Sequence, residues 1–219
     1  DVSHAQGGLY KGRKVGTFGD VAAMSLMSGK SFATGEGGIL VTNDREIYDR
    51  AIAFGHYERF NEKEIETGYL KPYMGLPLGG YKYRMHQMSS TVGRVQLKYY
   101  DERCEEIRKA MNYFWDLLDG VPGIKAHRPP EDSGSNMGGW YAPHGLYRPE
   151  ELEGLSVTRF TEAVRAEGFK GCHPGCNAAL HTHALFNTCD VYGHGKPTRI
   201  ANASRDVREL DASLPVSEK

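Results

Sequence analysis

The chain has 219 residues, and its 27 lysines and arginines against 28 aspartates and glutamates give a formal net charge of −1. This balance gives no electrostatic case for nucleic acid or an anionic membrane as a partner, and we expect neither. No apolar run approaches the roughly 20 residues that span a bilayer. Because four cysteines in a chain of this length do not indicate a small disulfide-stapled secreted domain, a reducing, cytoplasmic location is expected.

The first elements are two short apolar strands on either side of a glycine-rich loop. The strands are expected at 21–25 and 39–42, so the loop between them connects strand to strand. A helix is expected from Arg45 to Phe54, with Asn43 or Asp44 as its N-cap and Gly55 at its end.

A long loop and a long helical pattern follow. Residues 60–81 are rich in glycine, proline, tyrosine and charge, which predicts a loop. Residues 86–118 have helical spacing that far exceeds the mean helix length, so this helix either bridges two domains or breaks partway. A strand is expected within 140–147, and Ser156 is expected to cap a helix that runs to Ala166.

Lys30 stands between Gly29 and Ser31 in the glycine-rich loop and raises the question of a phosphate site. A phosphate-binding P-loop needs glycine at position 24, where the chain has Met24. A dinucleotide fingerprint that starts at Gly35 needs glycine at position 40, where the chain has Leu40. The sequence therefore excludes both common phosphate loops here.

Three other polar residues accompany this lysine at strand ends next to glycine turns. They are Asp1, His4 and Ser25, and an acid, an imidazole, a hydroxyl and an amine in such places are typical of a pyridoxal phosphate (PLP) site. Each residue alone would be assigned a structural role, since an isolated lysine in a loop is usually solvated. Only the set of four indicates chemistry.

The joint spacing of these residues carries a family resemblance. The chain has D-x-x-H-A-x-G from Asp1, G-x-x-G-D at 16–20, S-x-x-x-x-K-x-x-x-x-G-E-G-G at 25–38 and G-x-K-Y-R-M at 80–85. It resembles the DegT/StrS-type sugar aminotransferases of the aspartate aminotransferase (fold-type I) superfamily. The resemblance is strongest over 1–42, good over 79–118 and weaker beyond.

The resemblance implies an α/β PLP-dependent transferase fold with a three-layer α/β/α large domain, present in part, and a small α+β carboxyl-terminal domain. Residues 1–108 would be the end of the large domain with the start of an interdomain helix, and 109–219 the small domain. The chain begins at Asp1 without a methionine, so we expect a fragment that lacks the family's amino-terminal part and its extreme carboxyl terminus. Alone, it is expected to bind PLP poorly and to fold poorly, with an unpaired sheet edge.

The resemblance also implies a role for each residue of the set. Lys30 would be the catalytic residue, which forms a Schiff base with PLP and then moves a proton between substrate and cofactor. Asp1 would hold the proton on the pyridine nitrogen, His4 would lie near the 3-oxygen or the ring, and Ser25 would donate to the phosphate. Gly35, Gly37 and Gly38 would permit the turns into the next strand.

Two residues of the 80–85 motif are further candidates. Lys82 stands where many members of the family have an asparagine that reaches the partner subunit's cofactor phosphate, so a phosphate contact and a solvated lysine both remain open. A homodimer with a shared active site follows from the resemblance. Arg84 would either bind a substrate carboxylate or close the motif loop by hydrogen bonds.

The carboxyl-terminal third contains a cluster of cysteines and histidines. Cys172, Cys176, His181, His183 and Cys189 invite a zinc hypothesis, although their spacing is not one of the recurring zinc patterns. The resemblance favours His181 and His183 as substrate contacts, and no metal is expected. The pair Trp140–Tyr141 and His194 are further candidates for lining a sugar or cyclitol pocket, with core packing favoured for Trp140.

The function predicted from the resemblance is a PLP-dependent aminotransferase. It would take an amino group from an amino acid, glutamate or glutamine, and pass it to a nucleotide-linked keto-sugar or a keto-cyclitol. Related dehydratases of this fold have histidine in place of the lysine, so Lys30 argues against a dehydratase. A non-catalytic relative and a zinc-stabilised binding module built on the Cys172–Cys189 cluster also remain open.

Overall fold

The computed structural model describes residues 1–57, 63–76, 78–175, 179–197, 200–206, 208 and 214–216. The chain forms two compact units, Asp1–Leu152 and Glu153–Lys219. The predicted domain boundary at 108 falls inside a helix of the first unit and stays a prediction about the whole protein.

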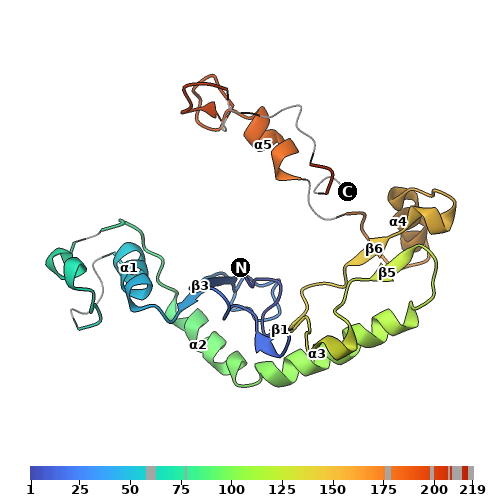
Figure 1. Ribbon diagram of the computed structural model, residues 1–219, viewed down its shortest axis with the longest axis horizontal. Coiled ribbons are helices and arrows are strands. Elements are labelled where there is room, and N and C mark those ends of the chain that lie inside the picture. The colour runs from blue at the N-terminus through green and yellow to red at the C-terminus, as the bar shows by residue number, and fades with distance from the viewer. Residues whose placement is uncertain are drawn as a thin grey trace. The chain divides into compact units, whose positions relative to one another are not determined.

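Three two-stranded antiparallel sheets form in the described part of the first unit (Figure 1). They pair β1 (Leu9–Tyr10) with β2 (Arg13–Lys14), β3 (Val21–Ser25) with β4 (Gly38–Thr42), and β5 (Ile124–Ala126) with β6 (Gly145–Tyr147). The register of β3 and β4 runs from Val21 opposite Thr42 to Ser25 opposite Gly38. Both strands therefore confirm the sequence prediction, and the lysine loop connects them as expected.

The strand predicted within 140–147 is shorter than expected. Only Gly145–Tyr147 pairs as β6, and Trp140, at the start of the predicted strand, has φ of +42°, which is outside the extended conformation. Trp140 is 5% exposed, so its predicted packing role is confirmed.

The helices of the first unit begin and end close to the predicted residues. Helix α1 covers Arg45–Gly55, and the Asp44 carboxylate accepts a hydrogen bond from the Ile47 amide at 3.0 Å as its N-cap. The long helical pattern breaks partway, one of the two outcomes predicted, into α2 (Gln87–Leu97) and α3 (Tyr100–Leu117), visible in green in Figure 1. Short 3₁₀ helices cover Gly68–Tyr73, Glu131–Ser133 and Pro149–Leu152, the first of them inside the segment predicted to be a loop.

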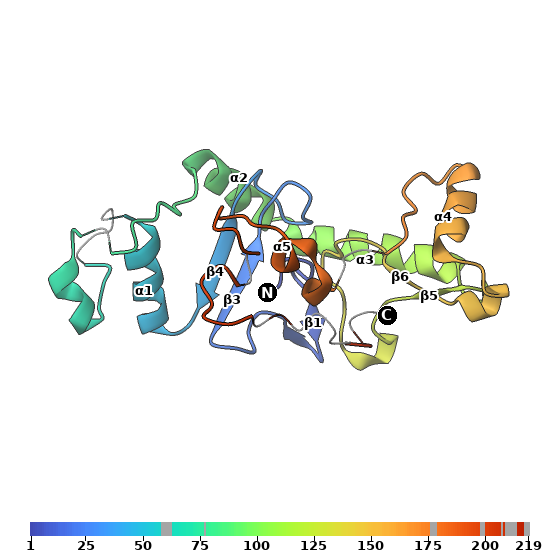
Figure 2. The ribbon, with the colours of Figure 1, turned by 90° about the horizontal axis from the view of Figure 1, so that it is seen from above.

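The core of the first unit includes residues on both sides of Lys30 in the lysine loop. Leu26, Phe32 and Tyr100 are 1%, 7% and 8% exposed, and Met24, Met85 and Cys104 pack against them. Figure 2 shows β3 and β4 side by side. Because Leu26 and Phe32 flank Lys30 in the chain, burial of their side chains fixes both ends of the loop that carries the lysine.

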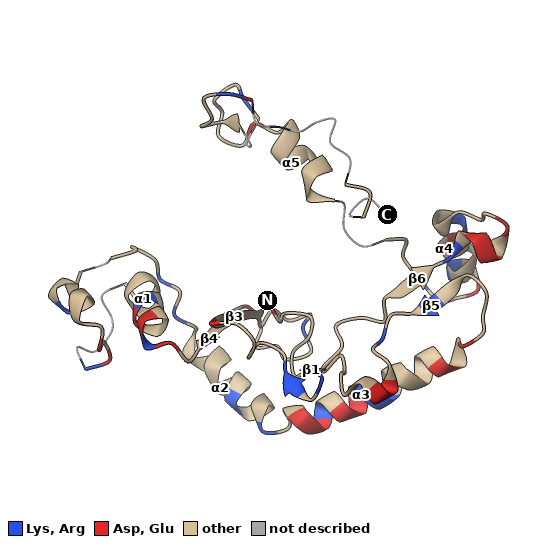
Figure 3. Ribbon diagram, in the orientation of Figure 1, with Lys and Arg blue, Asp and Glu red and all other residues tan. Residues whose placement is uncertain are grey.

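Helix α3 is rich in charged residues. Stretches of its ribbon coloured for acidic and for basic residues follow one another in Figure 3, and Arg108 and Lys109 both pair with Glu105. Pairs of this kind stabilise an exposed helix by about 0.2–0.5 kcal/mol each. Among the described residues, none of the helices is both long enough and apolar enough to cross a membrane.

The second unit contains α4 (Val157–Ala166), a 3₁₀ helix at Leu180–Thr182 and α5 (Ala184–Asn187). The Ser156 side chain caps α4 by accepting from the Arg159 amide at 3.3 Å, which confirms the predicted cap. In the loop after α5, the Asp190 carboxylate accepts from the amides of His194 and Gly195 at 3.1 and 2.7 Å.

Candidate active site

The lysine loop is closed by backbone hydrogen bonds at its base. The Leu26 amide donates to the Gly37 carbonyl at 2.8 Å, and the Thr34 amide donates to the Leu26 carbonyl at 2.9 Å. Within the loop, the Lys30 amide donates to the Met27 carbonyl at 2.9 Å and forms a tight turn. The loop is thus a closed backbone structure that presents Lys30 at its tip.

Two of the three glycines after the lysine, Gly35 and Gly37, have the turn conformations that the sequence predicts. Gly35 has φ of +102° and Gly37 has φ of +154°, values that L side chains rarely adopt. A Cβ on Gly37 would lie 3.2 Å from the Met85 Cε, so the turn also packs against the end of the 80–85 motif. Gly38 lies in β4 without a positive φ, so its predicted role as a turn residue stays a prediction.

The Lys30 amine lies over the ring of Tyr141, on which the His4 ring also stacks. Its Nζ is 4.2 Å from the centroid of the Tyr141 ring, and the His4 ring stacks on the same tyrosine at 3.9 Å with an interplanar angle of 4°. Within the described residues this amine has no carboxylate as an ion-pair partner. An ammonium over a tyrosine face gains about 0.5–1 kcal/mol at an exposed position. Lys30, His4 and Tyr141, the amine cluster, are therefore held together by ring contacts.

The surroundings of His4 lower the pKa of its imidazole. Partial loss of hydration lowers the pKa of its imidazole below 6.5, and the positive charges of Lys30 and His144 lower the pKa further. The neutral imidazole is therefore the main form near pH 7, with one ring nitrogen free to accept a hydrogen bond and the other to donate one.

We expect Lys30→Met to raise the pKa of His4, because the substitution removes an ammonium that disfavours the charged imidazolium. The measurement is an NMR titration of the His4 ring protons in both proteins. Lys125→Met is the matched control, since it removes the same charge from β5. An equal rise in the two variants would show that net charge, and not the neighbouring amine, controls His4.

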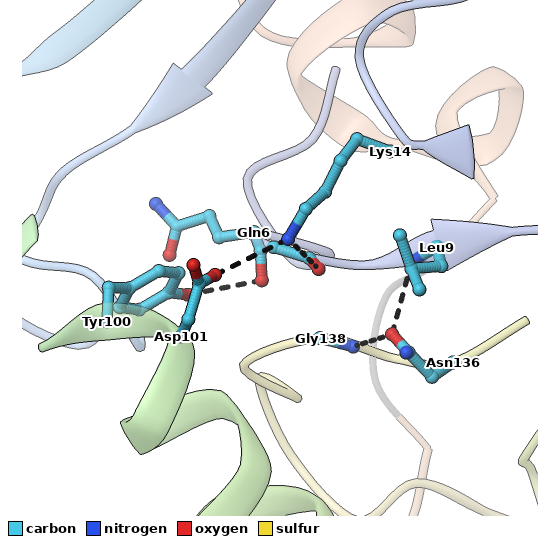
Figure 4. A network of polar contacts seen from close by, with 8 residues as sticks. Gln6, Leu9, Lys14, Tyr100, Asp101, Asn136 and Gly138 are labelled. Carbon is cyan, nitrogen blue, oxygen red and sulfur yellow. Dashed lines mark hydrogen bonds and ion pairs between the residues drawn. The ribbon is translucent and has the colours of Figure 1, made fainter. Parts of the chain in front are cut away.

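A buried glutamine, for which the sequence contains no motif, organises the loop around Lys30. Gln6 is 4% exposed, its Oε1 accepts from the Phe32 amide at 2.9 Å, and its Nε2 donates to the Ser25 carbonyl at 2.8 Å. Its carbonyl accepts from the Tyr100 hydroxyl at 3.1 Å (Figure 4). One side chain thus joins the end of β3 to the residues after Lys30, while α3 holds its backbone.

Helices α2 and α3 both reach the same loop. Gln96, near the end of α2, donates to the Ala33 carbonyl at 2.7 Å, and the Tyr100 hydroxyl, at the start of α3, lies 2.8 Å from Ser31 Oγ. Burial raises the pKa of Tyr100 well above its usual range, so its hydroxyl stays protonated and can donate. The break between the two helices therefore lies where both of them contact the lysine loop.

The segment that carries Tyr141 packs directly on the backbone of 6–8. The Gly139 amide donates to the Gln6 carbonyl at 2.8 Å, and a Cβ on Gly138 would lie 2.7 Å from the Gly7 carbonyl carbon and closer still to Gln6 O and Gly8 N. The Asn136 Oδ1 accepts from the Leu9 and Gly138 amides at 3.1 and 3.0 Å, as Figure 4 shows. This close approach places Tyr141 beside His4.

The segment that follows Asp1 runs beside β3, and the Ser25 amide at the end of this strand donates to the Ser3 hydroxyl at 2.8 Å. The Val2 amide donates to the Ala23 carbonyl at 3.0 Å, so the residues after Asp1 run along β3. The exposed Asp1 carboxylate accepts from the Ser3 amide at 2.7 Å. The Ser25 hydroxyl accepts from the Met27 amide at 3.3 Å and, within the described residues, donates to no acceptor, so its hydrogen is available to a ligand.

Lys82 and Arg84 lie elsewhere on the first unit. The Lys82 Nζ is 4.7 Å from the centroid of the Tyr57 ring, and the Tyr83 amide donates to the Gly55 carbonyl at the end of α1 at 2.7 Å. Arg84 is exposed. Neither residue makes a described contact with the amine cluster, so their predicted roles remain predictions.

The histidines of the second unit have local structural contacts. His183 Nδ1 accepts from the Leu185 amide at 3.1 Å as the cap of α5, and the His181 carbonyl accepts from Asn187 Nδ2 at 2.6 Å. Cys176 lies outside the described residues, and within those described no group of three or more potential ligands is close enough to hold a metal ion. The substrate roles predicted for His181 and His183 remain predictions.

Comparison with known proteins settles the family. The DegT/DnrJ/EryC1/StrS aminotransferase family matches residues 1–216. The chain belongs to this family. Because the match includes the Cys172–Cys189 region, that region is part of the family's own sequence and does not indicate a separate zinc module.

Two curated relatives show how much of a whole protein the chain represents. An uncharacterized protein of Methanocaldococcus jannaschii is 33% identical over 234 residues, which cover 100% of this chain and 54% of the relative. A putative L-glutamine:3-amino-2,3-dideoxy-scyllo-inosose aminotransferase of Micromonospora echinospora is 32% identical over 190 residues, which cover 85% of this chain and 43% of the relative. The chain thus spans about half the length of the curated relatives it matches.

Solved structures establish the fold. An aminotransferase from Psychrobacter cryohalolentis aligns with a TM-score of 0.60 at 22% sequence identity. The alignment covers 81% of this chain and 51% of the aminotransferase chain. The GDP-4-keto-6-deoxy-D-mannose-3-dehydratase of E. coli, solved with bound hydrated PLP, aligns with a TM-score of 0.58 at 22% identity over 74% of this chain and 42% of its own. The fold-type I fold of PLP-dependent transferases predicted from the sequence is therefore confirmed.

Proposed function

We propose that this chain is part of a PLP-dependent aminotransferase that passes an amino group from glutamate or glutamine to a nucleotide-linked keto-sugar or a keto-cyclitol. The observation that carries the proposal is Lys30, which a closed loop holds with its amine over the Tyr141 ring in a chain of an aminotransferase family. Its relatives include a GDP-perosamine synthase of Caulobacter vibrioides, 26% identical over 98% of this chain, and the Micromonospora protein.

The described residues fit PLP. The cofactor needs an amine that can bond to its aldehyde, a carboxylate for its ring nitrogen and donors for its phosphate. Lys30 has no carboxylate partner in the described structure, Asp1 has an exposed carboxylate at the end of the strand region, and the Ser25 hydroxyl keeps a hydrogen to donate. Ser25 and Lys30 lie at or after the end of β3, and Asp1 precedes the segment that bonds to β3 at Ala23 and Ser25.

Each of these residues would then have one task. PLP supplies the electron sink that amino-group transfer needs. Lys30 would hold the cofactor covalently and, when released, its Nζ would take the proton from Cα of the amino donor and return one to the acceptor's product carbon. Asp1 would keep the ring nitrogen protonated, and Ser25 would donate to the phosphate. His4 would contact the ring or its 3-oxygen as a neutral imidazole.

The proposal includes a homodimer with a shared active site. Lys82 makes no described contact with the amine cluster of its own chain, and it is exposed on the segment after α1. In a dimer it would reach the phosphate held by the partner subunit as a point charge. Arg84, His181 and His183 would contact the substrate. A cytoplasmic location stays a prediction from the composition.

The first experiment is borohydride reduction in the presence of PLP on the longest natural form of the chain, followed by peptide mapping of every lysine. We expect a pyridoxyl group on Lys30 and none at that position in Lys30→Ala. Lys14→Ala, which removes a nearby exposed lysine, is the control and should leave the label on Lys30 unchanged.

A folded protein with no label on Lys30 would refute the proposal. A label on Lys30 without amino transfer from either donor to any keto-sugar or keto-cyclitol would indicate a non-catalytic relative instead. If the label is present, screening of the two amino donors with a panel of keto acceptors identifies the substrates.

A further inference from the structure

Tyr141 contacts both functional members of the amine cluster, yet none of the motifs includes it. Its ring centroid is 4.2 Å from Lys30 Nζ, and the ring is parallel to His4 at 3.9 Å. The tyrosine comes from a segment more than 100 residues after Lys30, so local sequence does not place it there. The contact is a product of the fold.

Close packing of the surrounding backbone holds Tyr141 in this place. Gly138 has φ of +58° and Trp140 has φ of +42°, two left-handed residues within three positions. Gly139 also has no room for a side chain, because an added Cβ would meet the Tyr100 hydroxyl at 2.5 Å and the Ser31 hydroxyl even closer. Strained backbone in a closely packed segment is typical of sites where one side chain needs a defined position.

The ring face offers the amine an electrostatic contact. The face of an aromatic ring is electron-rich, so it attracts an ammonium and not a neutral amine. The positive charges of Lys30 and His144 both lower the pKa of the His4 imidazole, after the larger effect of its partial burial. Within the described residues no carboxylate pairs with Lys30, and its amine contacts the face of Tyr141.

We propose that Tyr141 is a positioning residue that holds the Lys30 ammonium on its ring face whenever this lysine is not covalently occupied. This inference rests on the proposed function, in which Lys30 alternates between a bound and a free state. A free lysine that has taken a proton would move onto the ring face and remain next to the reacting atoms instead of extending into solvent. The tyrosine hydroxyl has no part in this role.

The test is competitive acetylation of the cofactor-free protein with trace acetic anhydride at pH 8, read for each lysine by peptide mass spectrometry. Only the neutral amine reacts, so the rate reports how far the protein holds the amine as a cation. Lys71, exposed in a 3₁₀ helix, is the internal reference. In Tyr141→Leu the Lys30 rate relative to Lys71 is expected to rise about two- to five-fold, and in Tyr141→Phe it is expected to stay at the wild-type value.

Two outcomes would overturn the proposal. One is an unchanged Lys30 rate in Tyr141→Leu, and the other is an equal change in the Phe and Leu variants, which would assign the effect to the hydroxyl. Tyr141→Met, a second non-aromatic variant, carries the same prediction as Tyr141→Leu if the latter does not fold. Because the protein is assayed without PLP, failure here is separate from failure of the proposed function, which the PLP label on Lys30 decides.

Discussion

Gly138→Ala is expected to destabilise the protein by about 3–4 kcal/mol, the largest effect of any single methyl group added near the site. The added Cβ would overlap backbone atoms of Gln6, Gly7 and Gly8, which cannot rotate away as a side chain can. In addition, φ of +58° costs a residue with a Cβ about 1–2 kcal/mol. Because domains are stable by only about 5–15 kcal/mol, this loss is a large share of the total.

Gly134→Ala is the matched control for this substitution. Gly134 has φ of +67°, in the same left-handed region, but the nearest atom to an added Cβ is the Gly12 nitrogen at 3.4 Å, an ordinary contact. We expect a loss of about 1–2 kcal/mol there, from the backbone conformation alone. The difference between the two variants isolates the cost of the close approach.

Urea denaturation of the longest natural form measures both variants. Equal stabilities of Gly138→Ala and Gly134→Ala would show that the segment does not pack on residues 6–8 in solution. The packing also links stability to the site, because the displaced segment carries Tyr141. A surviving fraction of folded Gly138→Ala should therefore show faster acetylation of Lys30, as Tyr141→Leu should.

The sequence predicted those structural features that depend on residues close together in the chain. The strands around the lysine loop, the Asp44 and Ser156 caps and the positive φ of Gly35 all follow from short patterns of residue type. Lys30 could be singled out because its spacing to Asp1, Ser25 and the glycines is a family pattern, even though no single member carries a signal.

The residues that the sequence could not predict act over long separations. Gln6 bonds with residues 19, 26 and 94 positions away, and Tyr141 meets His4 through a turn packed on the backbone. A lone glutamine in a glycine-rich turn and a tyrosine in a loop have no periodic pattern, and which turns pack together is a tertiary property. Gly138, which permits that packing, is one of many glycines in the sequence. The sequence therefore singled out Lys30, and named Tyr141 as a candidate pocket residue, but it predicted neither the contact of Tyr141 with Lys30 nor the bonds of Gln6.

The second large effect is expected at Asp49, whose side chain is completely buried in α1. Its Oδ2 accepts from the Glu66 amide at 2.9 Å and from the Thr67 amide and hydroxyl, both at 2.7 Å. Asp49 Oδ1 forms an ion pair with Arg45 Nη2 at 2.8 Å. The carboxylate thus attaches residues 66 and 67 to helix α1. These residues precede the segment that carries Lys82.

Asp49→Ala is expected to cost about 2–3 kcal/mol, because it leaves two backbone amides and a hydroxyl without their acceptor. Asp49→Asn keeps one carbonyl acceptor but loses the attraction to Arg45, so we expect a smaller loss at neutral pH. Urea denaturation at pH 7 measures both. Leu97→Ala, at an exposed position of α2, is a control that should change stability little.

The stability that Asp49 contributes should also depend on pH in a defined direction. Burial alone would raise the pKa of its carboxyl, but the bonds from Thr67 and Glu66 and the charge of Arg45 outweigh burial and lower the pKa below 3.8. A lowered pKa in the folded state means that the unfolded chain binds the proton more tightly. The contribution of Asp49 to stability is therefore fully present above the unfolded pKa and disappears as the pH falls through the folded pKa.

The stability gap between wild type and Asp49→Asn should therefore be constant above about pH 5 and should shrink as the pH is lowered below about 4. A gap that widens on acidification would show that burial dominates and that Asp49 is protonated in the folded protein, in which case the segment is held by neutral hydrogen bonds and Arg45 has no part in it.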